Sequence, residues 1–214
     1  MESLKPVPPN LKTLPVNLRF EHKIWKRNID RIAGVDESGR GPLAGPIVAA
    51  AVIFRPYEHI EGVRDSKELS PALRQELFEL IREKAVAIGV GIIGNRIIDD
   101  INIRQATLEA MRRAIQGLSV RPQYVLIDGR DILDDFPEQQ AIIDGDRLSF
   151  TISAASIIAK VTRDRIMEKY HRKYPQFGFS HNMGYATKFH REMIKRFGFC
   201  QIHRRSFLSK VLAE

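Results

Sequence analysis

The stretch AGVDESGRGPLAGPIVAAAVIF constrains the fold more than any other part of the chain. Residues 31–37 and 47–54 are rich in Val, Ile and Ala, which is typical of buried strands. The turn between them, residues 38–46, holds three glycines and two prolines, so the backbone must bend sharply in this glycine turn. Asp36 and Glu37 stand side by side at the end of the first strand, where two adjacent charges cost stability unless something uses them.

The rest of the chain alternates strands with helices. Ser70 followed by Pro71 predicts a helix start, with apolar residues at helical spacing behind it. Asn102 with Gln105 resembles a capping box that opens a helix to about Gly117. Further strands are expected at 87–93, 124–129 and 139–144, and further helices at 150–172 and 187–197. This order predicts an α/β fold, a mixed sheet flanked by helices with a helical C-terminal part.

Composition bounds the class of protein. A chain of 214 residues, 43% of them hydrophobic, is sufficient for one large domain. We expect a proline-containing, partly extended lead-in over 1–30 and one domain over 31–214. No stretch approaches the roughly 20 apolar residues of a membrane-spanning helix, and the N-terminus lacks the apolar core of a signal peptide. The one cysteine, Cys200, allows no internal disulfide or thiolate zinc site. We therefore expect a soluble, cytoplasmic monomer that does not bind membranes.

Positive charge is concentrated near the C-terminus. Residues 160–214 carry 13 Lys and Arg against 4 Asp and Glu, a net charge of +9, whereas the whole chain has +8. Such a segment is typical of a face that binds a polyanion. The alternative, a solvated helix surface that only aids solubility, agrees equally well with the charge.

Three predicted strand ends carry acids: Asp36 with Glu37, Asp128, and Asp146. If these strands are neighbours, their ends meet at one edge of the sheet, where ligand sites of α/β proteins usually lie. Clustered carboxylates repel one another unless a divalent cation neutralises them, and oxygen ligands alone favour Mg²⁺ or Mn²⁺ over zinc. Two such ions about 3.5–4 Å apart can activate a water and stabilise the leaving oxygen of a phosphodiester.

The acids also have plainer interpretations. Asp-Gly pairs such as Asp128-Gly129 are most often simple turns. In addition, successive strand side chains point to opposite faces, so Asp36 and Glu37 can serve one site only if regular pleating stops near Glu37. Gly39 is placed to allow that change.

The glycine turn matches neither of two common phosphate-binding loops. A dinucleotide loop needs G-x-G-x-x-G opening a helix, whereas Gly39-Arg40-Gly41 leads into a strand. A P-loop needs Gly-Lys-Ser/Thr, which this turn lacks. What remains is a turn whose backbone amides and Arg40 can approach a sugar-phosphate chain closely.

Six motifs, in order and spacing, resemble the type 2 ribonucleases H, the bacterial ribonuclease HII family. They are AGVDESGRGPLAGPIVAAAVIF, Asp65-Ser66-Lys67, YVLIDG, GDRLSFTISAASIIAKVTRDRIM, MGYATKFH and IHRRSF. The resemblance implies a ribonuclease-H-like fold with a five-stranded mixed sheet flanked by helices. The implied activity is endonucleolytic cleavage of RNA in RNA–DNA hybrids, and incision on the 5′ side of single ribonucleotides within duplex DNA, leaving a 3′-hydroxyl.

The resemblance also implies roles for particular acids. Asp36, Glu37 and Asp128 match the family's metal-binding acids, and Asp146 matches its fourth active-site carboxylate. The implied cofactor is Mn²⁺ or Mg²⁺, with two ions during catalysis.

The substrate contacts are implied in the same way. Gly39, Arg40 and Gly41 match the turn that reads the ribose 2′-hydroxyl at the RNA–DNA junction, in agreement with the 2′-hydroxyl being what distinguishes RNA from DNA. Tyr185 matches the aromatic residue that stacks on the following deoxyribose. Phosphate contacts are further expected from three basic residues: Lys67, Lys160 and Arg163.

Some features depart from the family pattern, and two rival functions remain. Ser38 replaces the usual Ala. The lead-in is too short for the extra N-terminal domain of ribonuclease HIII, and the longer C-terminal extension of some relatives is missing, so 160–214 is expected to do most of the duplex binding. A non-catalytic nucleic-acid-binding module explains the basic segment but not the acids. A structure-selective DNA nuclease explains the acids but not the turn.

Overall fold

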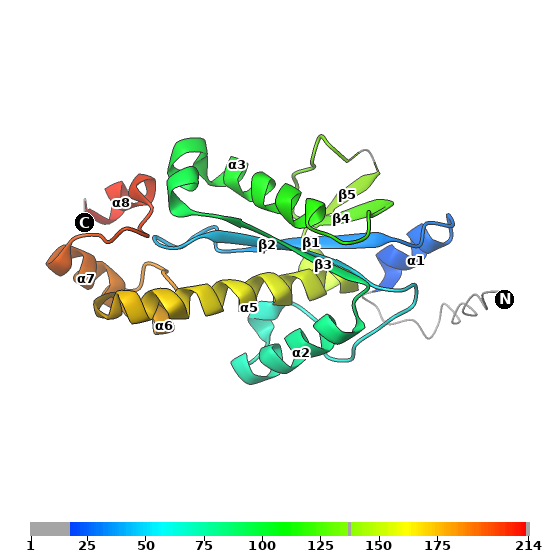
Figure 1. The fold of residues 1–214 in the computed structure, drawn as a ribbon, viewed down its shortest axis with the longest axis horizontal. Coiled ribbons are helices and arrows are strands. Elements are labelled where there is room, and N and C mark those ends of the chain that lie inside the picture. The colour runs from blue at the N-terminus through cyan, green and yellow to red at the C-terminus, as the bar shows by residue number, and fades with distance from the viewer. Residues whose placement is uncertain (1–17, 137, 213–214) are drawn as a thin grey trace.

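The computed structural model describes residues 18–136 and 138–212 of the chain, arranged as helical layers around a central sheet (Figure 1). The strands are β1 (Ile32–Ser38), β2 (Ile47–Ile53), β3 (Ala87–Ile93), β4 (Tyr124–Asp128) and β5 (Gln139–Ile142). The helices are α1 (Arg19–Trp25), α2 (Pro71–Lys84), α3 (Asn95–Gln116), α4 (Gly145–Leu148), α5 (Phe150–Lys173), α6 (Phe179–Asn182), α7 (Lys188–Phe197) and α8 (Arg205–Leu212). Two short 3₁₀ helices, η2 (Ser66–Glu68) and η3 (Pro175–Phe177), complete the elements.

The sheet has five strands in the order β3-β2-β1-β4-β5. β1, β2 and β3 form an antiparallel meander, and β4 and β5 run parallel to β1 and to each other. All seven residues of β2 are buried, as expected of a strand covered by helices on both faces. The predicted five-stranded mixed sheet flanked by helices is confirmed.

Helix α3 covers one face of the sheet and α5 covers the other, with α2 packed against α5 (Figure 1). The two faces bury separate apolar clusters, one with Val35 and Ala110 on the α3 side and one with Val52 and Ile157 on the α5 side. A side chain at Gly34 would place its Cβ 2.1 Å from the Thr151 carbonyl carbon. The start of α5 therefore lies directly against β1, just before the acid pair.

Helix α1 falls within the segment expected to be a lead-in and packs into the core. Ile24 and Trp25 are buried, and the carboxylate of fully buried Glu21 accepts hydrogen bonds from the Ser149 hydroxyl (2.7 Å) and the Thr151 N–H (3.0 Å). Glu21 thereby ties α1 to the first turn of α5. The prolines expected to extend the chain lie outside the described residues.

Most predicted element boundaries agree with the structure to within one residue. The helix predicted to open at Asn102 is present, as the second of two segments in α3. The first segment, which was not predicted, begins at Asn95, and the two meet at a kink where Asn102 adopts φ 65° and ψ 165°. Its side-chain oxygen still accepts from the N–H of Gln105 (3.1 Å) and caps the second segment. The strand predicted over 139–144 ends at Ile142, because Asp144 adopts a left-handed φ of 55°. Among the described residues, no helix is both long and apolar enough to cross a membrane.

Candidate active site

Asp36, Glu37 and Asp128 meet where β1 and β4 end. The parallel register places Val35 beside Ile127, so the residues that follow, Asp36 and Asp128, are neighbours across the two strands. One carboxylate oxygen from each of the three acids lies within 4.8 Å of the others. Within 18–136 and 138–212, this is the one group of three or more His, Cys, Asp or Glu side chains that could share a metal ion.

The prediction that regular pleating stops near Glu37 is wrong. β1 stays paired with β2 through Ser38. The Glu37 carboxylate reaches the same site because β4 ends at Asp128, so no β4 residue lies beside Glu37. The Glu37 N–H also donates a hydrogen bond to Asp36 Oδ1 (2.6 Å), which holds the Asp36 carboxylate at the strand end.

Burial and mutual repulsion raise the pKa of all three acids. Burial raises the pKa of Asp36 well above its usual range, and the charges of Glu37 and Asp128 add to this effect. Burial also raises the pKa of Glu37 to about 7, although the Arg40 guanidinium, 3.6 Å away, opposes the shift. For Asp128, burial and the charge of Asp146 raise the pKa. The ionised cluster is therefore unfavourable alone, and a bound cation would relieve it.

Asp146 lies beside this group without joining it. It is buried in α4, and its Oδ2 accepts a hydrogen bond from Lys67 Nζ at 3.1 Å. Lys67 belongs to η2, whose N-cap residue Asp65 accepts from the Lys67 backbone N–H (3.0 Å). The motif Asp65-Ser66-Lys67 thus places an ammonium group against the fourth predicted carboxylate.

The three acids open onto a cleft of about 420 Å³. Six other predicted site residues line it: Gly39, Arg40, Gly41, Lys67, Lys160 and Tyr185. Four further lining residues were not predicted as site residues from the sequence: Ser38, Ser66, Arg74 and Ser156. Lys160 Nζ donates to Asp164 at 2.7 Å, and the Arg74 guanidinium lies 3.8 Å from the same carboxylate. Basic side chains from α2 and α5 therefore border the acids.

The structure contradicts the prediction of Arg163 as a phosphate contact. Its side chain is fully buried under the glycine turn, where its guanidinium donates to the carbonyls of Pro46 (3.0 Å), Met183 (3.0 Å) and Ala44 (3.2 Å). A Cβ at Gly39, which has φ 104°, would lie 2.2 Å from Arg163 Nε. Arg163 therefore supports the turn from within and does not reach the surface.

A second buried arginine, Arg204, was not singled out from the sequence. Its guanidinium donates to the carbonyls of Gly39 (2.6 Å), Arg40 (2.9 Å) and Gly45 (3.0 Å). Burial, and then the nearby charge of Arg163, lower its pKa to about 9. The motif IHRRSF contains Arg204 next to the exposed Arg205, and no pattern in the sequence separates the two.

Tyr185 is held in place by a pair of buried histidines. The Tyr185 carbonyl is 2.8 Å from His190 Nδ1, and His190 Nε2 is 3.0 Å from His203 Nε2. His203 Nδ1 accepts from the Cys200 N–H at 2.9 Å, so His203 Nε2–H donates to His190, and His190 Nδ1–H donates to Tyr185. Both rings must be neutral in this arrangement. Consistently, burial lowers the pKa of both, that of His203 to about 4.

Solved structures share this architecture. The ribonuclease H2 from Pyrococcus horikoshii OT3 matches with a TM-score of 0.72 and 32% identity, covering 85% of this chain and 96% of that one. The PCNA:RNase HII complex from Archaeoglobus fulgidus matches with a TM-score of 0.69 and 28% identity, covering 82% and 94%. A Bst-RNase HIII structure in complex with Mn²⁺ matches at 20% identity with a TM-score of 0.67, covering 86% and 69%, and shares the fold. Fold and site together define a nuclease of the ribonuclease H type.

The family is shown by sequence. The ribonuclease HII family model matches residues 33–210. Ribonuclease HII of Syntrophus aciditrophicus (strain SB) is 53% identical over 192 residues, which is 89% of this chain and 90% of that protein. Ribonuclease HII of Clostridioides difficile (strain 630) is 49% identical over 193 residues, 90% and 76% of the two. The chain belongs to the ribonuclease HII family, whose members are endoribonucleases with ribonuclease H activity on RNA–DNA hybrids, and the predicted family is confirmed.

Proposed function

We propose that this chain is a metal-dependent endonuclease that hydrolyses the RNA strand of RNA–DNA hybrids and also incises duplex DNA on the 5′ side of single embedded ribonucleotides. Its products would carry a 3′-hydroxyl and a 5′-phosphate, as primer removal and ribonucleotide removal require. One observation carries the proposal. The acid group and the glycine turn with Tyr185 line the same cleft, so that a metal-binding element and a sugar-reading element face one substrate.

We propose that the acid group binds divalent cations, Mn²⁺ or Mg²⁺, with two ions present during catalysis. Its donors are carboxylate oxygens alone, which these hard cations prefer. The raised pKa values of Asp36 and Glu37 indicate that the negative charge there lacks compensation. Asp36, Glu37 and Asp128 would hold the ions, with Asp146 completing the set from α4. When bound, the ions would supply an activated water and Lewis-acid stabilisation of the phosphodiester.

Gly41 supports a close approach by the substrate. Its φ lies outside the left-handed region, and an added Cβ would contact only Tyr185, with Cε1 at 3.8 Å. The described part of the protein therefore does not require glycine at this position, in contrast to Gly39. We assign Gly39, Arg40 and Gly41 to the ribose 2′-hydroxyl and Tyr185 to the deoxyribose that follows it.

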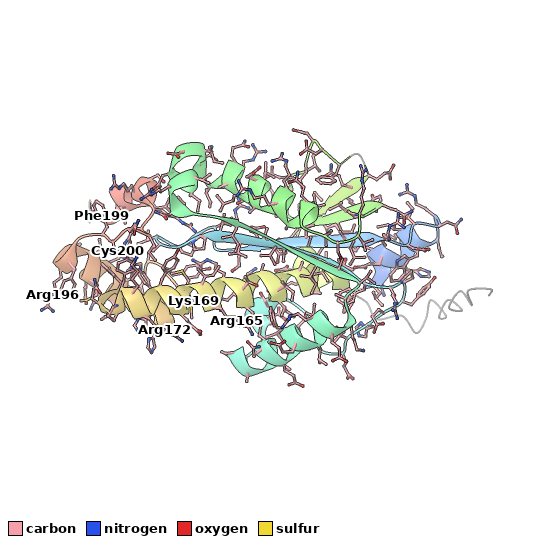
Figure 2. All side chains as sticks on the ribbon, viewed as in Figure 1. Arg165, Lys169, Arg172, Arg196, Phe199 and Cys200 are labelled. Carbon is pink, nitrogen blue, oxygen red and sulfur yellow. The ribbon has the colours of Figure 1, made fainter. Side chains whose placement is uncertain are left out.

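The exposed face of α5 would hold the duplex beyond the cleft. Arg165, Lys169 and Arg172 are exposed along this helix, and Arg196 extends the basic surface at α7 (Figure 2). Residues 165–172 span about 10 Å of helix, which is roughly the rise of three base pairs. Lys67 and Lys160 line the cleft itself and remain proposed phosphate contacts.

We further propose that the protein acts as a cytoplasmic monomer whose partner is nucleic acid. The acids, the turn, Tyr185 and the basic face of α5 all belong to one chain. A monomer therefore supplies every group that the proposal uses.

Cleavage of matched duplexes tests the proposed function. Three labelled substrates are compared in Mn²⁺ or Mg²⁺ and in a chelator: a duplex with one ribonucleotide, an all-DNA duplex, and a long RNA–DNA hybrid. We expect cuts 5′ of the single ribonucleotide, cuts throughout the hybrid, none in all-DNA, and none with the chelator. Cleavage of all-DNA duplex would favour the structure-selective DNA nuclease, and binding without cleavage of any substrate would favour the non-catalytic module.

A further inference from the structure

Arg204 holds the glycine turn by hydrogen bonds on the buried side of the turn. The backbone of 202–204 pairs with the turn, because the Gly45 N–H donates to the Ile202 carbonyl (2.9 Å) and the Arg204 N–H donates to the Leu43 carbonyl (2.8 Å). This pairing aims the Arg204 guanidinium at the carbonyls of Gly39 and Arg40, at 2.6 and 2.9 Å. Gly39 is buried, whereas Arg40 and Gly41 are exposed at the cleft.

Because the peptide bond is planar, the hydrogen bonds from Arg204 to the two carbonyls also fix the direction of the N–H groups that follow them. None of the described peptide bonds is cis, and in a trans peptide the N–H points opposite to the C=O. The Gly39 carbonyl points at buried Arg204, so the Arg40 N–H points toward the cleft. The Arg40 carbonyl does the same, so the Gly41 N–H also points toward the cleft. No hydrogen bond from either N–H to another described residue is present.

We infer that Arg204 is a positioning residue for sugar recognition: it aims the backbone N–H groups of Arg40 and Gly41 at an acceptor oxygen of the ribose. The inference rests on the proposed function, and extends it to a residue that does not touch the cleft. The positive charges of Arg204 and Arg163 behind the turn polarise its peptide groups. Both N–H groups thereby become better donors toward an oxygen in front of them.

A lysine cannot replace this arginine. The guanidinium presents its donors in a planar fork, which here serves three carbonyls in different directions, those of Gly39, Arg40 and Gly45. An ammonium group keeps the charge but cannot reproduce that fork. Arg204→Lys should therefore release the turn while preserving the net charge and leaving the acids untouched. Arg205→Lys is the matched control, because Arg205 is exposed and its guanidinium lies over the Phe199 ring, 5.4 Å from the ring centroid.

The experiment measures binding, so it does not depend on catalysis. Affinities for a duplex with one ribonucleotide and for the same duplex in all-DNA are compared in Ca²⁺, and their ratio is the ribose discrimination. We expect Arg204→Lys to reduce this ratio on the order of tenfold, the effect of one to two amide hydrogen bonds. Arg205→Lys should keep the ratio of the unaltered protein. Mn²⁺ affinity should be the same in all three proteins.

Each outcome has a distinct meaning. If the unaltered protein does not discriminate, the proposed function itself fails. If it discriminates and Arg204→Lys discriminates equally well, the inference about Arg204 is overturned. Equal weakening on both duplexes would also overturn it, since it would point to a phosphate oxygen as the acceptor.

A measurement on the unaltered protein covers the case in which Arg204→Lys fails to fold. The amide resonances of Arg40 and Gly41 should shift when the ribonucleotide duplex is added and should shift less with the all-DNA duplex. Equal shifts with both duplexes, or none, would overturn the inference.

Discussion

Gly39 and Gly41 stand two residues apart in one turn, and alanine should act on them in opposite ways. At Gly39 the backbone has φ 104°, and the new Cβ would lie 2.2 Å from Arg163 Nε and 2.8 Å from the Pro46 carbonyl oxygen. Backbone strain of this kind costs about 1–3 kcal/mol. Displacing the buried guanidinium leaves carbonyls unpaired, at about 1–3 kcal/mol more. Gly39→Ala should thus lower the free energy of unfolding by about 2–6 kcal/mol.

At Gly41 the same methyl group has room. Its nearest described atom is Tyr185 Cε1 at 3.8 Å, so the free energy of unfolding should change by no more than about 0.5 kcal/mol. The methyl group nevertheless occupies space where we place the ribose. Misplacement of a substrate by about 1 Å can cost on the order of 100-fold in rate, so Gly41→Ala should lose about 10–100-fold in cleavage of a single-ribonucleotide duplex.

Urea unfolding and initial cleavage rates, measured on both variants and on the unaltered protein, test the pair together. In thermal unfolding, the midpoint of Gly39→Ala should fall by about 4–24 °C for a chain of this size, whereas that of Gly41→Ala should stay unchanged. Similar losses of stability in the two variants would refute the claim that a Cβ is excluded at Gly39 but tolerated at Gly41. Full activity in Gly41→Ala would refute the close approach of the sugar.

Four further predictions follow from the same structure. Asp128→Asn should remove most cleavage activity, but the stability of the metal-free protein in thermal unfolding should be unchanged or higher. The substitution relieves repulsion among the acids and keeps an acceptor for the Gly145 N–H, so a large loss of stability would mean that Asp128 has a structural role. Lys169→Glu should reduce the slope of log affinity against log salt concentration by about 1 or more, and an unchanged slope would place the duplex elsewhere. Tyr185→Ala should lose about 10–100-fold, more on a single ribonucleotide than on a long hybrid, while Tyr185→Phe retains much of the activity; equal losses on both substrates would remove the junction role. Burial lowers the pKa of His203 to about 4, so between about pH 6.5 and 4 the unfolded chain protonates this histidine and the folded protein does not. The free energy of unfolding should therefore fall by up to about 1.4 kcal/mol per pH unit as the pH decreases through that window. Urea unfolding of His203→Gln should show a shallower fall, and an identical fall would contradict the neutral state of His190 and His203.

The acid group was predictable because it is a property of strand ends. Asp36, Glu37 and Asp128 each follow a short apolar run, and strands of an α/β sheet bring such positions to one edge. Carboxylate oxygens by themselves favour Mg²⁺ or Mn²⁺, so the metal-binding role of these acids could be predicted without knowing which side chains surround them. Asp146 was harder to place, since the strand predicted before it ends early and the acid lies instead in α4.

The two buried arginines could not have been found in the same way. A basic residue in a basic segment predicts a solvated or phosphate-binding side chain, and Arg163 was interpreted so. Burial of a guanidinium depends on carbonyls supplied by a turn more than 100 residues away in the chain, which no local pattern records. The first segment of α3, residues 95–101, was missed for a different reason: the non-helical backbone at Asn102 interrupts the helical period, and the prediction began the helix only at that residue.

The contact between Arg204 and Gly39 joins residues 165 positions apart. Closing so long a loop is among the slower events of folding, and on a ribosome it must wait until synthesis has passed residue 204. The segments that carry Asp36, Glu37 and Asp128 are therefore synthesised early, whereas the hydrogen bonds from Arg204 to the glycine turn can form only late. Selectivity for ribose would then be the last property of the enzyme to mature, and a chain interrupted before residue 204 would carry the carboxylates without the aimed amides.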